Sequence, residues 1–104
     1  MSDKRNIIIS KVKNAVAELD ENSEVILFGS RARGDFKEDS DWDFAAFANL
    51  DVNNNTRKIL THKIFEIELE TGSAISVFLY SFNHKKEYAK SLFFQNINEE
   101  GILV

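Results

Sequence analysis

The chain has 104 residues and a mass of 11.9 kDa, the size of one compact domain, and its 43% hydrophobic and 29% charged residues argue against a disordered, collagen-like or coiled-coil protein. It contains no cysteine, which excludes disulfides, thiolate metal sites and a thiol nucleophile, and His62 and His84 are too far apart in sequence to indicate a zinc centre. The net charge of −4 argues against general DNA or RNA binding, and no apolar run approaches the roughly 20 residues that span a bilayer. We expect one domain over residues 1–104, located in the cytoplasm because no apolar signal core follows the N-terminus.

The first two elements expected along the chain are a helix and a buried strand. Apolar residues recur at helical spacing from Ile8 to Leu19, which predicts an amphipathic helix over residues 3–19. Residues 24–28 form an almost wholly apolar run that ends at Gly29. Such a run is typical of a central strand covered on both faces.

Two further strands are expected over residues 41–48 and 74–80. The first begins with alternating acidic and aromatic side chains, and the second places Ser76 on the same face as Phe78 and Tyr80. Phe28, Trp42 and Phe44 are most simply part of the core.

The segment 54–70 fits two structures. Its apolar spacing, an asparagine cap at position 53 or 54 and a stop at Thr71-Gly72 favour a helix, whereas alternation of apolar residues with glutamates after residue 64 fits a strand. Length favours the helix.

A last helix is expected over residues 86–100, and residues 101–104 either end it or add a short edge strand. The element order predicts an α/β (α+β) domain, with a small mixed β-sheet on which helices pack.

Chemistry-bearing residues concentrate between Phe28 and Phe44. Gly29 and Ser30 stand where the buried strand ends and a short helical turn begins, and free N–H groups at such a place favour an anion such as phosphate. Arg31 and Arg33 add positive charge to this segment of an otherwise acidic chain.

Asp41 and Asp43 are two residues apart on an expected strand, so both carboxylates project from one face. Because two such carboxylates repel each other, a divalent cation would stabilise them, and oxygen ligands beside a phosphate site suit Mg²⁺.

Each of these features has a simpler interpretation when taken alone. A Gly-Ser after a strand is usually a turn, an Asp-x-Asp pair is more often a solvated strand face, and Arg31 and Arg33 could pair with Asp35 or Glu38 at the surface. The joint arrangement of strand, Gly-Ser, short helix, Gly34 and Ser-Asp-x-Asp strand favours a metal-bound nucleoside triphosphate.

At these residues the sequence resembles the minimal nucleotidyltransferase branch of the DNA polymerase β-like nucleotidyltransferase superfamily. Phe28-Gly29-Ser30, followed by Asp41-Trp-Asp-Phe44, matches the family pattern of an apolar residue, Gly-Ser and Asp-x-Asp between apolar residues. The Gly-Ser-Arg-Ala-Arg-Gly run and the Asn-Ile-x-x-Glu-Gly-Ile ending at residues 96–102 also match this branch.

The resemblance implies the polymerase β-like nucleotidyltransferase fold and a role for each matched residue. Gly29 and Ser30 would hold the triphosphate of ATP or another nucleotide, with one of Arg31 and Arg33 in contact with phosphate. Asp41 and Asp43 would be the catalytic residues and would bind one or two Mg²⁺ ions.

The sequence departs from the family pattern at one position. Active members usually carry a third carboxylate on a later strand, and the matching position here is Ser76. A hydroxyl is a poor Mg²⁺ ligand and a poor general base, so Ser76 leaves the expected metal site incomplete. Glu66, Glu68 and Glu70 are possible substitutes on the preceding element.

The resemblance implies Mg²⁺-dependent transfer of a nucleotidyl group, AMP from ATP, to a protein hydroxyl. The expected partner is a helical HEPN-domain protein, in which case this chain is the antitoxin of a toxin–antitoxin pair. The alternatives are a catalytically degenerate binding module that masks the toxin by contact, and a nucleotide sensor or orphan domain. Apolar residues near the C-terminus could be covered by a partner or by a second copy, although a core role is simpler for each.

Overall fold

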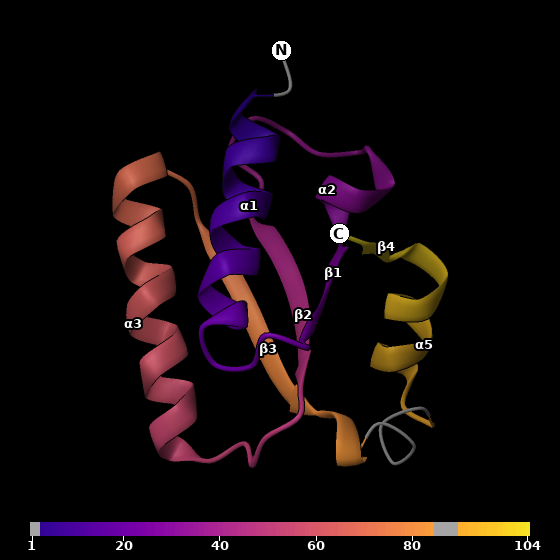
Figure 1. Ribbon diagram of the computed structural model, residues 1–104. Helices are drawn as coiled ribbons and strands as arrows, with labels where there is room; N and C mark the ends of the chain where they lie inside the picture. The colour runs from indigo at the N-terminus through magenta and orange to yellow at the C-terminus, as the bar shows by residue number, and fades with distance from the viewer. Residues whose placement is uncertain (1–2, 85–89) are drawn as a thin grey trace.

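The computed structural model describes residues 3–84 and 90–104 and contains a four-stranded mixed sheet with helices on both faces. The elements in chain order are α1 (Asp3–Ala17), β1 (Glu24–Phe28), α2 (Ser30–Arg33), β2 (Trp42–Ala48), α3 (Asn54–Thr71), β3 (Ile75–Ser81), a 3₁₀ turn (Phe82–His84), α5 (Leu92–Glu100) and β4 (Ile102–Leu103) (Figure 1). The predicted fold class is confirmed.

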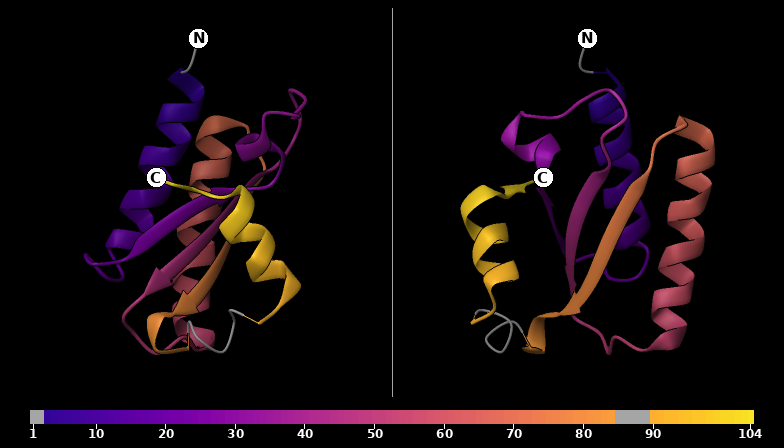
Figure 2. Two further views of the ribbon diagram at one scale, coloured as in Figure 1. Left: turned by 90° about the vertical axis from the view of Figure 1, so that its right-hand side faces the viewer. Right: turned by 180° about the vertical axis from the view of Figure 1, so that it is seen from behind.

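The strands lie in the order β3-β2-β1-β4. β1 pairs antiparallel with β2 and with β4, whereas β2 and β3 are parallel and are joined by α3. α1 and α3 cover one face of the sheet and α5 covers the other (Figures 1 and 2).

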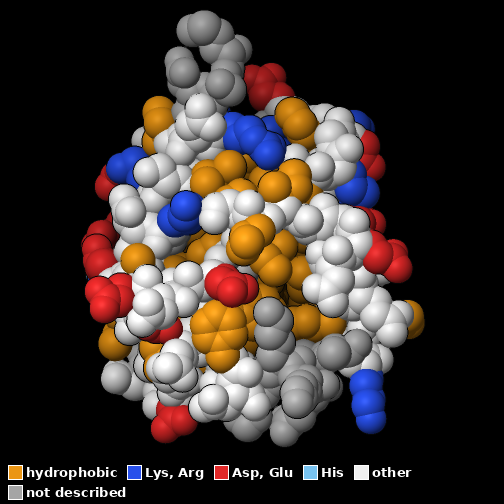
Figure 3. All heavy atoms as spheres, turned by 45° about the vertical axis from the view of Figure 1, so that its right-hand side comes forward, with side chains coloured by type: hydrophobic (Ala, Val, Ile, Leu, Met, Phe, Trp, Pro, Cys, Tyr) orange, Lys and Arg blue, Asp and Glu red, His pale blue; other side chains and the backbone are white. Residues whose placement is uncertain are grey.

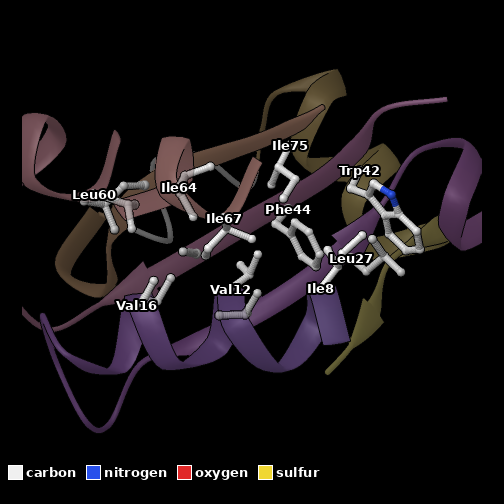
Figure 4. Close-up of a cluster of buried hydrophobic side chains, with 14 of the residues drawn as sticks. Ile8, Val12, Val16, Leu27, Trp42, Phe44, Leu60, Ile64, Ile67 and Ile75 are labelled. Carbon is white, nitrogen blue, oxygen red and sulfur yellow. The ribbon is translucent and has the colours of Figure 1, made fainter. Parts of the chain in front are cut away.

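The larger core lies under α1 and α3. Ile8 and Val12 from α1, Ile64 from α3, and Leu27 and Phe44 from the strands are all buried there (Figure 4). Burying such side chains contributes about 1.5–3 kcal/mol each. The smaller core under α5 consists of Ala45, Phe47, Phe94 and Ile97.

The predicted elements agree with the structure to within one residue at β3 (Ile75–Ser81 rather than 74–80) and at the end of α3 (Thr71), and three further ends differ. The segment 54–70 is a helix, as its length indicated, with Asn53 as its cap: the Asn53 side chain accepts from Thr56 N–H, and the Thr56 side chain accepts from Asn53 N–H. The first helix ends at Ala17 rather than at residue 19, because the next two residues turn toward β1.

The second difference lies at the C-terminal helix. It begins at Leu92 because the Ser91 side chain caps it by accepting from Phe94 N–H, so the predicted start at residue 86 is wrong for residues 90 and 91; residues 85–89 lie outside the described part. Residues 101–104 both end this helix and add a strand, since Ile102 pairs with Leu27 of β1.

The third difference is at β2, which begins at Trp42 rather than at Asp41. Of the aromatic residues expected in the core, Trp42 and Phe44 are buried, whereas Phe28 is only partly buried, under α5.

Some of the apolar residues near the C-terminus remain at the surface. Phe94 is buried in the smaller core, but Phe93, Ile102 and Leu103 are exposed. Hydrophobic side chains gather in the middle of the face that Figure 3 turns forward, with most charged side chains around them. In the described residues, no helix is long and apolar enough to cross a membrane.

Candidate functional site

The turn between β1 and α2 brings the backbone of Gly29 against an acidic side chain. Gly29 has φ 75° and ψ −159°, a conformation that is essentially restricted to glycine. A Cβ atom at this residue would lie 2.6 Å from Oδ2 of Asp43. The absence of a side chain therefore lets the Asp43 carboxylate approach the start of α2, where Ser30 is the first helical residue.

The two predicted acidic residues lie at the start of β2. Asp41 directly precedes the strand and is exposed, whereas Asp43 is its second residue and is partly buried. Burial, followed by the negative charge of Asp41, raises the pKa of Asp43, and the positive charge of Arg33 opposes this rise. In the protein without a bound cation, the charged form of Asp43 therefore lowers the stability of the fold.

Ser76, the position that matches the third carboxylate of the family, lies beside Asp43 in the sheet. Asp43 pairs with Phe28 on β1 and with Ser76 on β3, so the three side chains form one row on the α5 face of the sheet. The described residues contain no group of three or more acidic or histidine side chains that could hold a metal ion.

The three glutamates considered as substitutes are engaged elsewhere, on the helix that covers the opposite face. Glu68 accepts from the backbone N–H of Ile75 at 3.0 Å, Glu70 pairs with Lys11 at 2.6 Å, and Glu66 lies 3.4 Å from His62. None of them shares the row of Asp43.

The two arginines of the Gly-Ser-Arg-Ala-Arg-Gly run have different surroundings. Arg31 is buried and donates to the carbonyl oxygens of Glu38 and Ser40 at 3.0 and 3.1 Å. Its guanidinium carbon lies 4.4 Å from the ring centroids of both Phe36 and Trp42. This side chain thus holds the loop between α2 and β2 against the sheet.

Arg33 remains at the surface of the site. Its side chain pairs with Asp35 at 3.3 Å and with Glu100 at 2.9 Å, and these two carboxylates raise its pKa. The simpler interpretation as a surface ion pair with Asp35 therefore describes the observed contacts. Of the two arginines, Arg33 is the one whose charge acts on Asp43.

Sequence reasoning missed an aromatic cluster beside the row of Asp43 and Ser76. The rings of Phe28, Phe78 and Phe93 lie with centroids 5.5–6.0 Å apart. The alternation along β3 already placed Phe78 on the face of Ser76, but no local signal brings Phe93 to it from α5.

Comparison with known proteins identifies the family of the chain and structures of similar fold. The chain matches the nucleotidyltransferase domain family over residues 9–102, whereas no curated protein matches it significantly. Two crystal structures have a similar fold. The first is a toxin-antitoxin with AMP-PNP, with a TM-score of 0.58 and 20% sequence identity, and the match covers 88% of this chain and 70% of that chain. The second is a mutant of the toxin-antitoxin MntA-HpeT, with a TM-score of 0.63 and 19% identity, and the match covers 91% of this chain and 69% of that chain. At this identity the two likenesses establish the fold alone. With the family match extending over most of its length, the chain belongs to the nucleotidyltransferase domain family.

Proposed function

We propose that the chain binds a nucleoside triphosphate together with Mg²⁺ and transfers the nucleotidyl group, AMP from ATP, to a hydroxyl of a partner protein. The observation that carries this proposal is the approach of Asp43 to Gly29, with Oδ2 lying 2.6 Å from the position of a Cβ atom. Phosphate can reach the backbone at this turn because Gly29 has no side chain. The Asp43 carboxylate beside it can bind a metal ion.

The residues present fit Mg²⁺. Asp41 and Asp43 supply two hard oxygen ligands, and Mg²⁺ typically takes one or two carboxylates together with substrate phosphates. Burial and the charge of Asp41 raise the pKa of Asp43, so a cation between the two carboxylates would relieve their repulsion. When bound, Mg²⁺ neutralises charge that develops on the transferred phosphate.

The side chains around the turn have distinct tasks in this proposal. Backbone N–H groups at Gly29 and Ser30, with the Ser30 hydroxyl, hold the β- and γ-phosphates. Arg33 is the arginine that meets phosphate, because Arg31 is buried under the loop and bonded to carbonyl oxygens. The acceptor hydroxyl gives up its proton to solvent as its oxygen bonds to the α-phosphorus, the bond from that phosphorus to the bridging oxygen breaks, and pyrophosphate leaves.

The partner in this proposal is a toxin of the HEPN class, for which the chain acts as antitoxin. Support comes from the sequence resemblance and from the two similar structures, which both contain a toxin-antitoxin, one of them with AMP-PNP. The partner would supply the hydroxyl that is modified.

A second candidate function is supported by Ser76. Because a hydroxyl stands beside Asp43 where a third carboxylate would complete the site, the chain could bind nucleotide and mask the toxin by contact without transferring a nucleotidyl group. The two candidates share the nucleotide site and differ only in the transfer step.

The test is incubation with Mg²⁺ and ATP labelled at the α-phosphate, with and without the protein that the neighbouring gene encodes. We expect label on that protein with wild type and none with Asp43→Asn. Asp39→Asn removes the same charge from the neighbouring exposed loop and should transfer label normally. Bound ATP and a silenced toxin without label would establish the second candidate, and absence of ATP binding would refute both.

A further inference from the structure

The Asn-Ile-x-x-Glu-Gly-Ile ending of the sequence lies beside α2. It covers residues 96–102, at the C-terminal end of α5 and the start of β4 (Figure 1). Oε2 of Glu100 lies 2.9 Å from Nη1 of Arg33, although the two residues are 67 positions apart in the sequence. An ion pair thus joins the last helix to the short helix that follows the Gly29 turn.

The residues around Glu100 fix where its side chain begins. Ile97 is buried in the smaller core, and Ile102 pairs with β1. Gly101 passes so close to β1 that a Cβ atom there would lie 2.5 Å from Cγ2 of Ile26, and its N–H donates to the carbonyl oxygen of Ile97 at 2.7 Å. Because the backbone is anchored on both sides of it, Glu100 has a fixed place at the end of α5.

The backbone of Arg33 is fixed by the turn itself. Its N–H donates to the carbonyl oxygen of Gly29 at 3.0 Å, so the side chain starts one helical turn from the turn expected to hold phosphate. Asp35 and Glu100 bind different nitrogens of the guanidinium, Nε and Nη1, which fixes its plane. Within residues 3–84 and 90–104 no hydrogen bond uses Nη2, so its N–H groups remain for a phosphate.

Of the two carboxylates on Arg33, Glu100 is the closer and the less exposed. Its oxygen lies 2.9 Å from the guanidinium and its side chain is 34% exposed, whereas Asp35 lies 3.3 Å away and is 63% exposed. The hydrogen bond to Glu100 is also the largest cause of the raised pKa of Arg33. Held in this way, the positive charge of Arg33 still opposes the rise in the pKa of Asp43, so the guanidinium acts on the acidic row from its present place.

We propose that Glu100 is a positioning residue, which holds the guanidinium of Arg33 where the phosphates of a bound nucleoside triphosphate meet it. This role rests on the proposed function, in which Arg33 is the arginine that contacts phosphate. A long side chain that is already held loses less conformational freedom when it binds phosphate, so the ion pair raises the affinity for nucleotide. Glu100 itself touches neither nucleotide nor metal and acts only through Arg33.

Calorimetric titration of the full chain with ATP and Mg²⁺ tests this role. Glu100→Ala should raise the Kd for ATP roughly threefold to tenfold, the cost of ordering one long side chain. Glu99→Ala removes the same charge from the neighbouring exposed position and should leave the Kd unchanged. Glu100→Gln keeps an oxygen that accepts from Arg33, and it should bind ATP more tightly than Glu100→Ala although both variants lack the charge.

Two further variants separate positioning from a general loosening of α5. In an Arg33→Gln background, Glu100→Ala should not weaken ATP binding further, because Glu100 acts only through Arg33. Ser91→Ala removes the cap at the opposite end of α5 and leaves the ion pair intact. It should lower the melting temperature and bind ATP as wild type does. Unaltered circular dichroism would confirm that each variant folds.

The competing possibility has the opposite sign. If Glu100 competed with phosphate for Arg33, Glu100→Ala would bind ATP more tightly than wild type, and that result would overturn the proposal. Equal affinities of Glu100→Gln and Glu100→Ala, or an equal loss of ATP binding in Ser91→Ala, would overturn it as well. Wild type that binds ATP no better than Glu100→Ala would refute this role alone, whereas wild type that binds no ATP would refute the proposed function with it.

Discussion

Replacing Gly29 by alanine tests the close approach on which the candidate site depends. At φ 75° and ψ −159° an alanine is strained by its own backbone, whatever space surrounds it. The added Cβ would also lie 2.6 Å from Oδ2 of Asp43, closer than real contacts of this kind. The Asp43 side chain would have to leave its present orientation.

The backbone strain and the displacement of the Asp43 side chain together set the size of the stability loss. A backbone in this region costs about 1–3 kcal/mol for a residue other than glycine, and a side chain forced about 30° from its preferred rotamer costs about 0.5–1.5 kcal/mol. A loss of about 2 kcal/mol or more in the free energy of unfolding follows. For a domain of this size that lowers the melting temperature by about 8 °C or more.

Thermal melts of single and double variants separate the two effects. In an Asp43→Ala background the carboxylate is absent, so Gly29→Ala should cost about 0.5–1.5 kcal/mol less than in wild type. Gly72→Ala is the matched control, because Gly72 also has a positive φ, 68°, but a Cβ there meets nothing within 4 Å. A melting temperature of Gly29→Ala within about 2 °C of wild type, or a cost that Asp43→Ala leaves unchanged, would refute the reasoning.

Three further predictions concern the acidic row and the arginines. The raised pKa of Asp43 means that its charged form costs stability, so Asp43→Asn should melt higher than wild type at pH 7, and this gain should disappear as the pH falls through the pKa and the wild-type carboxyl becomes neutral. Ser76→Asp should melt lower than wild type without metal, because it adds a third negative charge, and should show the larger Mg²⁺-induced rise together with faster nucleotidyl transfer. Arg31→Gln should lose about 1.5–3 kcal/mol of stability with its buried charged hydrogen bonds, whereas Arg33→Gln should lose less stability and instead weaken ATP binding in calorimetry.

Each of these predictions has a result that contradicts it. If the higher melting temperature of Asp43→Asn persisted in acid, the carboxylate charge would not be its cause. Equal Mg²⁺ shifts for Ser76→Asp and wild type would mean that the serine does not face the metal. Equal losses of stability in the two arginine variants would contradict the assignment of Arg31 to the loop.

Much of the fold was predictable because local signals agreed with the tertiary structure. The apolar run of residues 24–28 is β1 to the residue, and the asparagine at position 53 caps α3. The alternation along residues 74–80 correctly placed Ser76 on the face of Phe78. The start of α5 was not predictable, because neither proline nor a change in apolar spacing separates Ser91 from the residues before it.

The candidate site was predictable in its residues but not in their surroundings. Arg31 and Arg33 are equivalent in sequence, and only the loop that brings Phe36 and Trp42 together around one guanidinium distinguishes them. The contact between Gly29 and Asp43 likewise depends on the pairing of β1 with β2, which no local pattern specifies. The roles of these residues in binding and catalysis stay predictions.

The division of the sheet into two faces has a consequence for hydrogen exchange. The larger core under α1 and α3 stabilises the sheet, whereas the face of Asp43 and Ser76 is covered by the nine residues of α5 and by a β4 of two residues. Few buried contacts oppose the detachment of residues 92–103, so their amides should exchange through a local opening of lower free energy than global unfolding. Amides of β2, at the centre of the sheet, should exchange only when the whole chain unfolds. The face of Asp43 and Ser76 can thus open to solvent, or to a partner, while the domain stays folded.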